Sequence, residues 1–495
     1  MVFGAISTAI GNYWLAFFGD FSVWTIGGAV LGYTGYNYML FGYLHFLVHR
    51  DRQDTGLLRQ NRPLVVAIAW TGYEYLKSVG FLGYPWGLIG YAPAVWLPVA
   101  QAVELAGIWG LTFLAVWINA AIVELLLLRE HPGRLGIRTE RYREKRFTLI
   151  PASEPARHLV AAVAVLAVLT TFGSVRLREF SPDRTTPEMT LRVLVVQQNI
   201  DSWAPGRFDD ALTRAQNLTL AALAEHRRTD EPPVDFVLWS ETSLRRPFLG
   251  TDDYYDTVPP ELPFTDFLRL IDRPLVTGVP MPAGNGPDLS NSAVVILPDG
   301  SITGVYAKQQ LVPFAERIPF WEHAAVRDFF RDIVGVYGTW MPGTESTVIP
   351  VPLKGSGTHQ LPTGLPICFE DGFGWVPREM VNNGANLLLN LTNNSWSRQN
   401  SAQTQHYVAA RLRSIELRTT LVRGTNSGLS GVVDRRGVLL SSIPMFESAA
   451  RVMTVPVHTP GWTLYRAVGD LPGQLAVVYV LLLVVWEAHR RRTRR

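Results

Sequence analysis

The chain of 495 residues contains a single cysteine, Cys368. One cysteine can neither form an intramolecular disulfide nor supply a cysteine-rich zinc site. The sequence also has no histidine pair at metal-ligand spacing, no glycine-rich phosphate loop and no Gly-x-Ser-x-Gly motif. Cys368 is therefore either a small buried apolar residue, as most free cysteines are, or a thiolate nucleophile.

Charged residues are also scarce, at 18% of the chain against 47% apolar residues. The apolar residues concentrate in the first ~175 and last ~25 positions, in runs approaching the ~20 residues that cross a bilayer. The stretch between them has the strands, turns and charged helices of a soluble domain, and the chain is too long for one ordinary core. We expect six membrane spans, at roughly 2–19, 23–48, 63–80, 95–128, 158–174 and 472–488.

The lysines and arginines between the expected spans alternate along the chain. Connections 49–62 and 129–157 and the tail 490–495 are rich in arginine, whereas connections 20–22 and 81–94 contain neither residue. Arginines can flank helices merely for solubility, but strict alternation follows the positive-inside rule. The rule places the basic connections and the C-terminus in the cytoplasm and the long soluble stretch on the outer face.

The expected organisation has a transmembrane helical bundle of about five spans over 1–174, a linker over 175–190 and a catalytic domain over 191–458. A C-terminal transmembrane helix with a basic cytoplasmic tail covers 459–495. This topology puts Cys368 on an oxidising side of the membrane, where cysteines usually pair. An unpaired thiol there is a liability unless it is buried or needed.

The soluble stretch has an α/β pattern. Residues 191–200 and 234–239 have the apolar character of buried strands, and residues 208–226 between them have helical spacing. Strand 386–392 and helix 402–416 repeat this alternation, and further segments have hairpin turns. Helices alternating with strands and hairpins predict a layered α/β domain with a mixed sheet.

Three residues with complementary chemistry lie at expected strand ends: Glu241, Lys308 and Cys368. Strand ends and the loops after them present reactive groups in layered α/β domains. A carboxylate can accept a thiol proton, an ammonium can stabilise a thiolate or an oxyanion, and a thiolate can hold an acyl group as a thioester. A lone glutamate or lysine at such a place is more commonly a solvated turn residue, and spacing alone does not bring the three together.

The segments around these residues resemble the glutamate, lysine and cysteine motifs of the nitrilase superfamily. They are Trp-Ser-Glu-Thr at 239–242, Tyr-Ala-Lys-Gln-Gln-Leu-Val-Pro-Phe-Ala-Glu at 306–316 and Ile-Cys-Phe-Glu at 367–370. With membrane helices on both sides, the chain is similar to the bacterial apolipoprotein N-acyltransferases. Further matching segments are 83–86, 196–200, 392–396 and 423–428.

The resemblance implies a multi-span α-helical membrane bundle plus an exported α/β domain, folded as a nitrilase-like αββα sandwich. It implies a two-step ping-pong reaction, in which an acyl chain passes from a phospholipid to the cysteine and then to the α-amino group of a diacylglyceryl-cysteine. In these roles Glu241 is the general base, Lys308 the oxyanion stabiliser and Cys368 the nucleophile. The expected supporting residues are Glu316, Phe369 and Glu370, and candidate pocket residues are Trp203, Trp396, Asn393 and Asn426.

The same resemblance implies a monomer in the bacterial inner membrane, with a phospholipid donor, a diacylated apolipoprotein acceptor and no cofactor or metal. The formal net charge is only +3, and no nucleic-acid partner is expected. Two other functions stay open: a membrane-tethered amidase or nitrilase acting on a small exported amide, and a non-catalytic lipid-binding scaffold. A fatty-acyl adduct on Cys368 would favour the transferase.

The stretch 314–340 is unusually apolar for a segment so close to Lys308. It is either internal core or a mobile arm that touches the bilayer and admits acyl chains.

Overall fold

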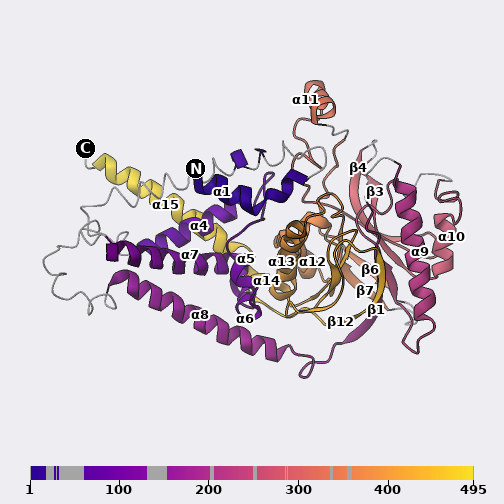
Figure 1. Ribbon diagram of the computed structural model, residues 1–495, viewed down its shortest axis with the longest axis horizontal. Helices are drawn as coiled ribbons and strands as arrows, with labels where there is room; N and C mark the ends of the chain where they lie inside the picture. The colour runs from indigo at the N-terminus through magenta and orange to yellow at the C-terminus, as the bar shows by residue number, and fades with distance from the viewer. Residues whose placement is uncertain are drawn as a thin grey trace. The chain divides into compact units, whose positions relative to one another are not determined.

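The computed structural model describes residues 2–17, 27–28, 30–32, 61–130, 153–200, 206–248, 254–284, 286, 288–334, 338–353 and 359–493. The chain forms two compact units (Figure 1). The helical unit comprises Met1–Asn12, Ile26–Ser181 and Ala467–Arg495, and the α/β unit comprises Tyr13–Thr25 and Pro182–Arg466.

The helical unit is built around long apolar helices. Its core joins Trp70 and Tyr73 of α4 to Leu114 and Trp117 of α7, with Ala162 of α8 packed against them. Small residues such as alanine allow close approach of helices. Its helices are α1 (Val2–Gly11), α4 (Arg62–Lys77), α5 (Tyr91–Ala94), α6 (Leu97–Ala100), α7 (Val103–Glu130), α8 (Glu154–Glu179) and α15 (Leu471–Thr493).

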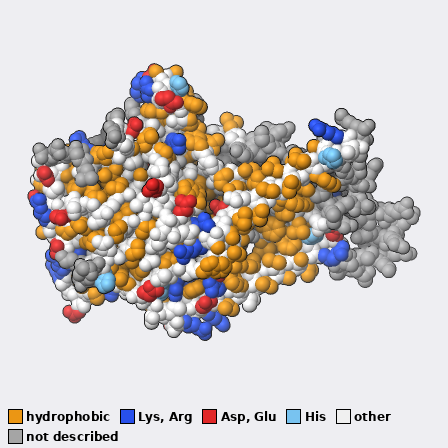
Figure 2. Space-filling model, turned by 180° about the vertical axis from the view of Figure 1, so that it is seen from behind, with side chains coloured by type: hydrophobic (Ala, Val, Ile, Leu, Met, Phe, Trp, Pro, Cys, Tyr) orange, Lys and Arg blue, Asp and Glu red, His pale blue; other side chains and the backbone are white. Residues whose placement is uncertain are grey.

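Two helices of the described part of the chain are long and apolar enough to cross a membrane, Val103–Leu127 and Glu154–Glu179, and Leu471–Trp486 is a shorter apolar segment. Large apolar side chains of these helices are exposed, among them Val168 and Leu482 at 67% and 62%. Figure 2 shows such side chains gathered over the helical unit. Exposed apolar surface of this extent is unfavourable in water and suits lipid.

Several details differ from the expected spans. α1 has ten residues, a length of about 15 Å, so within 2–19 it is too short to cross a hydrocarbon core of about 30 Å. The expected span 95–128 is divided, because α7 begins at Val103 and its Gly107 has a φ of 60°. α8 continues to Glu179, past the expected end at 174. Most of the expected span 23–48 lies outside the described residues, and the six-span bundle stays a prediction.

The α/β unit contains two six-stranded mixed sheets. The first has the order β12-β1-β2-β3-β4-β5 and the second β11-β10-β9-β8-β7-β6. In each sheet three neighbouring strands run parallel, β1-β2-β3 and β7-β8-β9, and the other pairs are antiparallel. The strands are β1 (Met189–Gln197), β2 (Phe236–Leu238), β3 (Leu275–Pro282), β4 (Leu289–Ile296), β5 (Ile302–Ala307), β6 (Val348–Pro352), β7 (Gln360–Gly364), β8 (Leu387–Thr392), β9 (Thr420–Thr425), β10 (Ser430–Val433), β11 (Leu439–Ile443) and β12 (Ala449–Val457).

Helices cover the outer faces of both sheets, as Figure 1 shows. Helices α9 (Phe208–His226) and α10 (Phe264–Ile271) pack on the first sheet, and α12 (Trp375–Asn382) and α13 (Asn400–Leu417) pack on the second. A buried cluster between the sheets joins Leu238 of β2 to Leu389 of β8. Strand β8 is buried at all six residues, since it is covered on both faces. The expected mixed-sheet α/β domain is confirmed, as two stacked sheets with helices on their outer faces.

The apolar stretch after Lys308 contains the short helix α11 (Ala324–Phe329), which projects from the α/β unit in Figure 1. Phe314, Phe320 and Phe329 are exposed at 47%, 66% and 44%. These three side chains do not form internal core, whereas Ile318 of the same stretch is 3% exposed, and the lipid-contacting arm stays a prediction.

Candidate active site

The three candidate catalytic residues follow strands that belong to both sheets. Glu241 comes shortly after β2 and Lys308 directly after β5, both in the first sheet. Cys368 follows β7 of the second sheet and begins the 3₁₀ helix Cys368–Gly372. The site is therefore assembled from loops of two sheets that are distant in sequence.

Lys308 is fully buried between two carboxylates. Its Nζ lies 3.2 Å from Oε1 of Glu241 and 2.8 Å from Oε1 of Glu316. The amide nitrogen of Asn291 donates to the same two oxygens, at 2.8 Å and 3.2 Å. Burial by itself lowers the pKa of Lys308, but the charges of Glu241 and Glu316 raise that pKa well above its usual value. The ammonium therefore stays charged at neutral pH.

Backbone N–H groups hold the remaining oxygens of both carboxylates. The amide of Asn393 donates to Oε2 of Glu241 at 2.8 Å, and the amide of Val312 donates to Oε2 of Glu316 at 2.8 Å. Donors on both oxygens fix the orientation of each carboxylate. Glu241 is thus held in one orientation beside Lys308.

Glu370 joins the lysine loop to the cysteine loop. Its Oε1 accepts from the amide of Gln309 at 2.7 Å, and its Oε2 accepts from the amide of Ile367 at 2.7 Å. These amides adjoin Lys308 and Cys368, so one buried carboxylate sets the spacing of both backbones. Burial raises the pKa of Glu370 to about 7.

Cys368 is partly exposed and adopts a left-handed backbone conformation, with a φ of 49°. Such a φ costs a non-glycine residue about 1–3 kcal/mol and persists only where neighbouring structure holds it. Burial and the charge of Glu241 raise the pKa of the thiol well above its usual value, against the opposing charge of Lys308. At neutral pH the sulfur is protonated, so nucleophilic attack requires a base.

The other predicted site residues pack against aromatic rings or support a loop of the site. Phe369 is buried and packs edge-on against Phe373, with ring centroids 4.9 Å apart. Asn426 donates to the side-chain oxygen of Asn393 at 3.0 Å, which supports the loop whose backbone binds Glu241. Trp396 belongs to the same loop and packs on Trp14, at 5.6 Å between centroids. Trp203 lies outside the described residues.

Sequence reasoning missed Asn291, Asp371 and His406. Asn291 lies between Ser290 and Ser292 in strand β4, and a polar run leading into an apolar strand is the signal that could have identified it. Asp371 and His406 form a buried pair, with 2.7 Å between Oδ1 and Nε2. They are far apart in sequence, so no local pattern predicts their contact.

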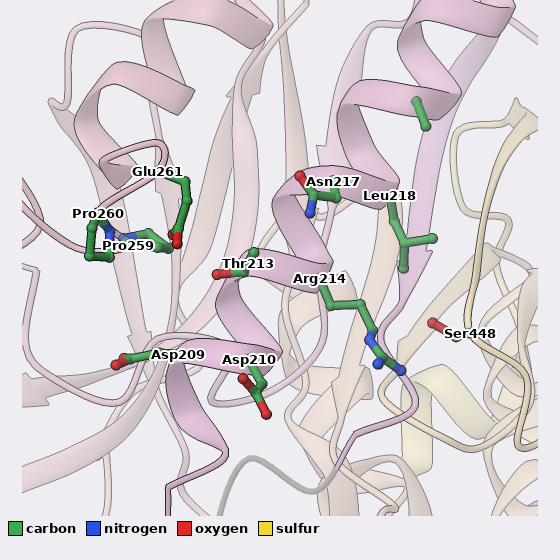
Figure 3. Close-up of a pocket in the computed structure, with 11 residues that line it drawn as sticks. Asp209, Asp210, Thr213, Arg214, Asn217, Leu218, Pro259, Pro260, Glu261 and Ser448 are labelled. Carbon is green, nitrogen blue, oxygen red and sulfur yellow. The ribbon is translucent and has the colours of Figure 1, made fainter.

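A separate surface groove lies along α9, lined by Asp210, Arg214 and Glu261 among others (Figure 3). The groove contains none of the candidate catalytic residues. Across the described ranges, no group of three or more histidine, cysteine or acidic side chains could hold a metal ion.

Comparison with known proteins places this chain in a family. A carbon-nitrogen hydrolase family model matches residues 196–466, and one described as an apolipoprotein N-acyltransferase N-terminal domain matches residues 1–121. The α/β unit thus carries a carbon-nitrogen hydrolase domain. The crystal structure of carbon-nitrogen hydrolase from Helicobacter pylori G27 is similar over 54% of this chain and 89% of that chain, with 17% identity and a TM-score of 0.38.

Two relatives align with nearly the whole chain. Apolipoprotein N-acyltransferase 2 of Treponema denticola is 35% identical over 98% of this chain and 87% of its own length. Apolipoprotein N-acyltransferase 2 of Treponema pallidum is 33% identical over 95% of this chain and 82% of its own length. The chain therefore belongs to the apolipoprotein N-acyltransferase family, a group of acyltransferases with a carbon-nitrogen hydrolase domain.

Proposed function

We propose that this protein transfers a fatty acyl chain from a phospholipid to the N-terminal α-amino group of diacylated apolipoproteins. The observation that carries the proposal is the fully buried Lys308 held between Glu241 and Glu316, in a loop that Glu370 joins to the loop of the chain's single cysteine. Membership of the N-acyltransferase family and the exposed apolar helices support a lipid substrate.

In the first step, Glu241 accepts the proton of the Cys368 thiol. The sulfur then attacks the carbonyl carbon of the phospholipid ester, and the resulting oxyanion is stabilised by the ammonium of Lys308. Collapse of this intermediate breaks the ester C–O bond, and the departing lysophospholipid oxygen takes the proton from Glu241. The product is a thioester on Cys368.

In the second step, the α-amino group of the lipoprotein attacks the thioester carbon. Glu241 accepts a proton from the nitrogen, and Lys308 again stabilises the oxyanion. Breaking of the C–S bond releases the amide product, and the proton returns from Glu241 to the sulfur. The raised pKa of the Cys368 thiol fits this cycle, because proton transfer to Glu241 restricts thiolate formation to the time of attack.

We further infer a multi-span protein of the bacterial inner membrane with the α/β unit on the outer face, the C-terminus in the cytoplasm and a monomeric state. The alternating basic connections support this topology. Tethering the site to a membrane raises the effective concentration of lipid substrates.

Reconstitution of the full chain tests the proposed function. The protein is placed in vesicles that contain a phospholipid with an alkyne-tagged acyl chain, and a synthetic diacylated lipopeptide is added. We expect a tagged thioester on Cys368 in the intact-mass spectrum and then a tagged amide on the lipopeptide.

A lipopeptide with an acetylated α-amino group is the matched control. With it, the thioester should accumulate and no tagged amide should form. Release of ammonia from a small aliphatic amide without any acyl adduct would instead identify the membrane-tethered amidase. Lipid binding without either product would identify the non-catalytic scaffold.

A further inference from the structure

The backbone carbonyl of Cys368 is held by a side chain from the helix that covers the second sheet. Nε2 of His406, on α13, lies 3.1 Å from this oxygen. The same nitrogen lies 2.7 Å from Oδ1 of Asp371, in the 3₁₀ helix that Cys368 begins. One imidazole therefore contacts the turn of the nucleophile at two positions.

The partners of His406 determine its protonation. A carbonyl oxygen and a carboxylate oxygen can only accept, so Nε2 must carry the proton and donate to both. The other ring nitrogen, Nδ1, lies 3.3 Å from the amide nitrogen of Asn394, an arrangement in which Nδ1 accepts. Partners on both ring nitrogens thus fix the orientation of the imidazole.

A buried charge pair orients this imidazole. Nη1 of Arg423 lies 3.3 Å from Oδ2 of Asp371, and the side chains of Arg423, Asp371 and His406 are all at most 5% exposed. Arg423 also donates to the backbone oxygen of His406 at 3.4 Å. The negative charge of Asp371 is therefore compensated by Arg423 at one oxygen, while the other oxygen binds His406. A carboxylate orients a histidine in the same way in other sites.

The geometry excludes His406 as the base for Cys368 in this arrangement, since its only proton-bearing nitrogen is committed to two oxygens. His406 instead contacts the backbone of Cys368, the residue of this turn whose conformation is least favourable. Cys368 has a φ of 49°, a conformation that needs external support. The donated hydrogen bond fixes the peptide unit that directly follows that residue.

We propose that His406 is a positioning residue, which through the Cys368 carbonyl holds the left-handed turn and keeps the thiol beside Glu241 and Lys308. Asp371 and Arg423 orient the His406 ring for this purpose. The proposal rests on the proposed function for its effect on turnover, but the position of the thiol can be measured without any acyl substrate.

Two neutral amide substitutions test the proposal in the full-length protein. The side-chain nitrogen of glutamine reaches the place of Nε2 in His406→Gln, whereas asparagine in His406→Asn is too short. Acyl transfer and the rate of Cys368 alkylation by iodoacetamide are measured across pH. His226→Asn is the matched control, since Nε2 of His226 also contacts a backbone carbonyl, that of Pro232 at 2.8 Å, but at the exposed end of α9.

We expect His406→Gln and His226→Asn to stay within about threefold of the wild type. His406→Asn should lose on the order of 10²-fold in turnover, the usual cost of displacing a reacting group by about 1 Å. Its alkylation midpoint should also move to lower pH by about one unit, because the thiol leaves its buried position and the negative charge of Glu241, which together outweigh the opposing charge of Lys308. Unfolding would also lower the midpoint, so alkylation is measured only on monodisperse protein whose circular dichroism matches that of the wild type.

Equal turnover and equal alkylation midpoints in His406→Gln and His406→Asn would overturn the proposal, as would lost turnover with an unchanged midpoint. If His406→Asn does not fold, His406→Ser, whose side chain is also too short to reach the partners of Nε2, replaces it, and an unshifted midpoint there has the same meaning. A wild type that transfers no acyl chain removes the proposed function, while the alkylation midpoints still decide the role of His406.

Discussion

Oε1 of Glu241 lies 3.2 Å from Nζ of Lys308, with both side chains buried. The residues follow different strands of one sheet, and Cys368 approaches from the other sheet. The contact therefore joins two loops of the first sheet at the place that faces the second sheet.

Substitution of the nucleophile should abolish the covalent intermediate. Cys368→Ser is expected to lower acyl transfer by on the order of 10⁴-fold or more, as for loss of a nucleophile in other covalent enzymes. No acyl adduct should appear in its intact-mass spectrum after incubation with phospholipid vesicles. Turnover retained in this variant would contradict the assignment of Cys368.

Removal of the ammonium should destabilise the α/β unit as well as stop the reaction. In Lys308→Met the carboxylates of Glu241 and Glu316 lose their shared cation, and an unpaired buried charge typically costs about 3–5 kcal/mol. The double variant Lys308→Met with Glu316→Gln should regain part of this loss, because only one buried carboxylate remains. Denaturant unfolding of the four proteins of this cycle provides the measurement, and strictly additive effects would argue against the contact.

A methyl group added at Gly278, next to the backbone of Glu241, should lower turnover without removing any candidate catalytic side chain. A Cβ at Gly278 of β3 would lie 2.3 Å from the backbone nitrogen of Thr242 and 2.6 Å from Cα of Glu241. Gly278→Ala must therefore displace Glu241, and we expect a fall in turnover of about 10²-fold. Gly286→Ala is the control, since its Cβ would meet nothing within 4 Å. Equal activities of the two variants would contradict the prediction.

Glu370 should give the protein a defined pH dependence of stability. Its folded-state pKa of about 7 exceeds the ordinary value of 4.5, so the folded state binds more protons than the unfolded state between these pH values. Stability should therefore fall as pH rises from about 4.5 to 7, by roughly 3 kcal/mol. Glu370→Gln should flatten this slope in unfolding experiments, whereas Glu225→Gln on exposed α9 should keep it. An identical slope in wild type and Glu370→Gln would refute the assignment.

The proposed topology can be tested by labelling single-cysteine variants made in the Cys368→Ser background. Asp230→Cys, in the exposed turn after α9, should react with a membrane-impermeant maleimide on intact spheroplasts. Thr493→Cys, at the end of α15, should react only after the membrane is permeabilised. The reverse labelling pattern would overturn the orientation.

Local sequence determined the secondary structure of the α/β unit more closely than that of the helical unit. The helical spacing of 208–226 predicts α9 with its observed bounds, because one amphipathic face and charged ends specify a helix locally. The region 95–128 is predominantly apolar, so its hydrophobic pattern does not mark the break at Gly107. Apolar composition predicts burial or lipid contact but does not by itself show where a helix turns.

The candidate site also has features that the sequence predicts and features that it does not. The types of Glu241, Lys308 and Cys368 and the motifs around them come from the sequence, since chemistry resides in residue type and local spacing. The contacts between these residues cannot be predicted from the sequence, because the residues follow strands of two sheets that meet only after the core has formed. The sequence left open whether Glu316 and Glu370 are catalytic or structural, and the structure brings Glu316 to the ammonium of Lys308 and Glu370 to backbone amides.

By itself, then, the sequence of this protein determined a single available thiol, a mixed α/β domain between apolar segments and the family to which the motifs are similar. Tertiary structure alone decided that Lys308 lies between two carboxylates, that Asn291 bridges them and that His406 holds the Cys368 carbonyl. The physical reason is that these contacts join segments far apart in the chain. Their geometry depends on how the two sheets and their covering helices pack, which no local pattern encodes.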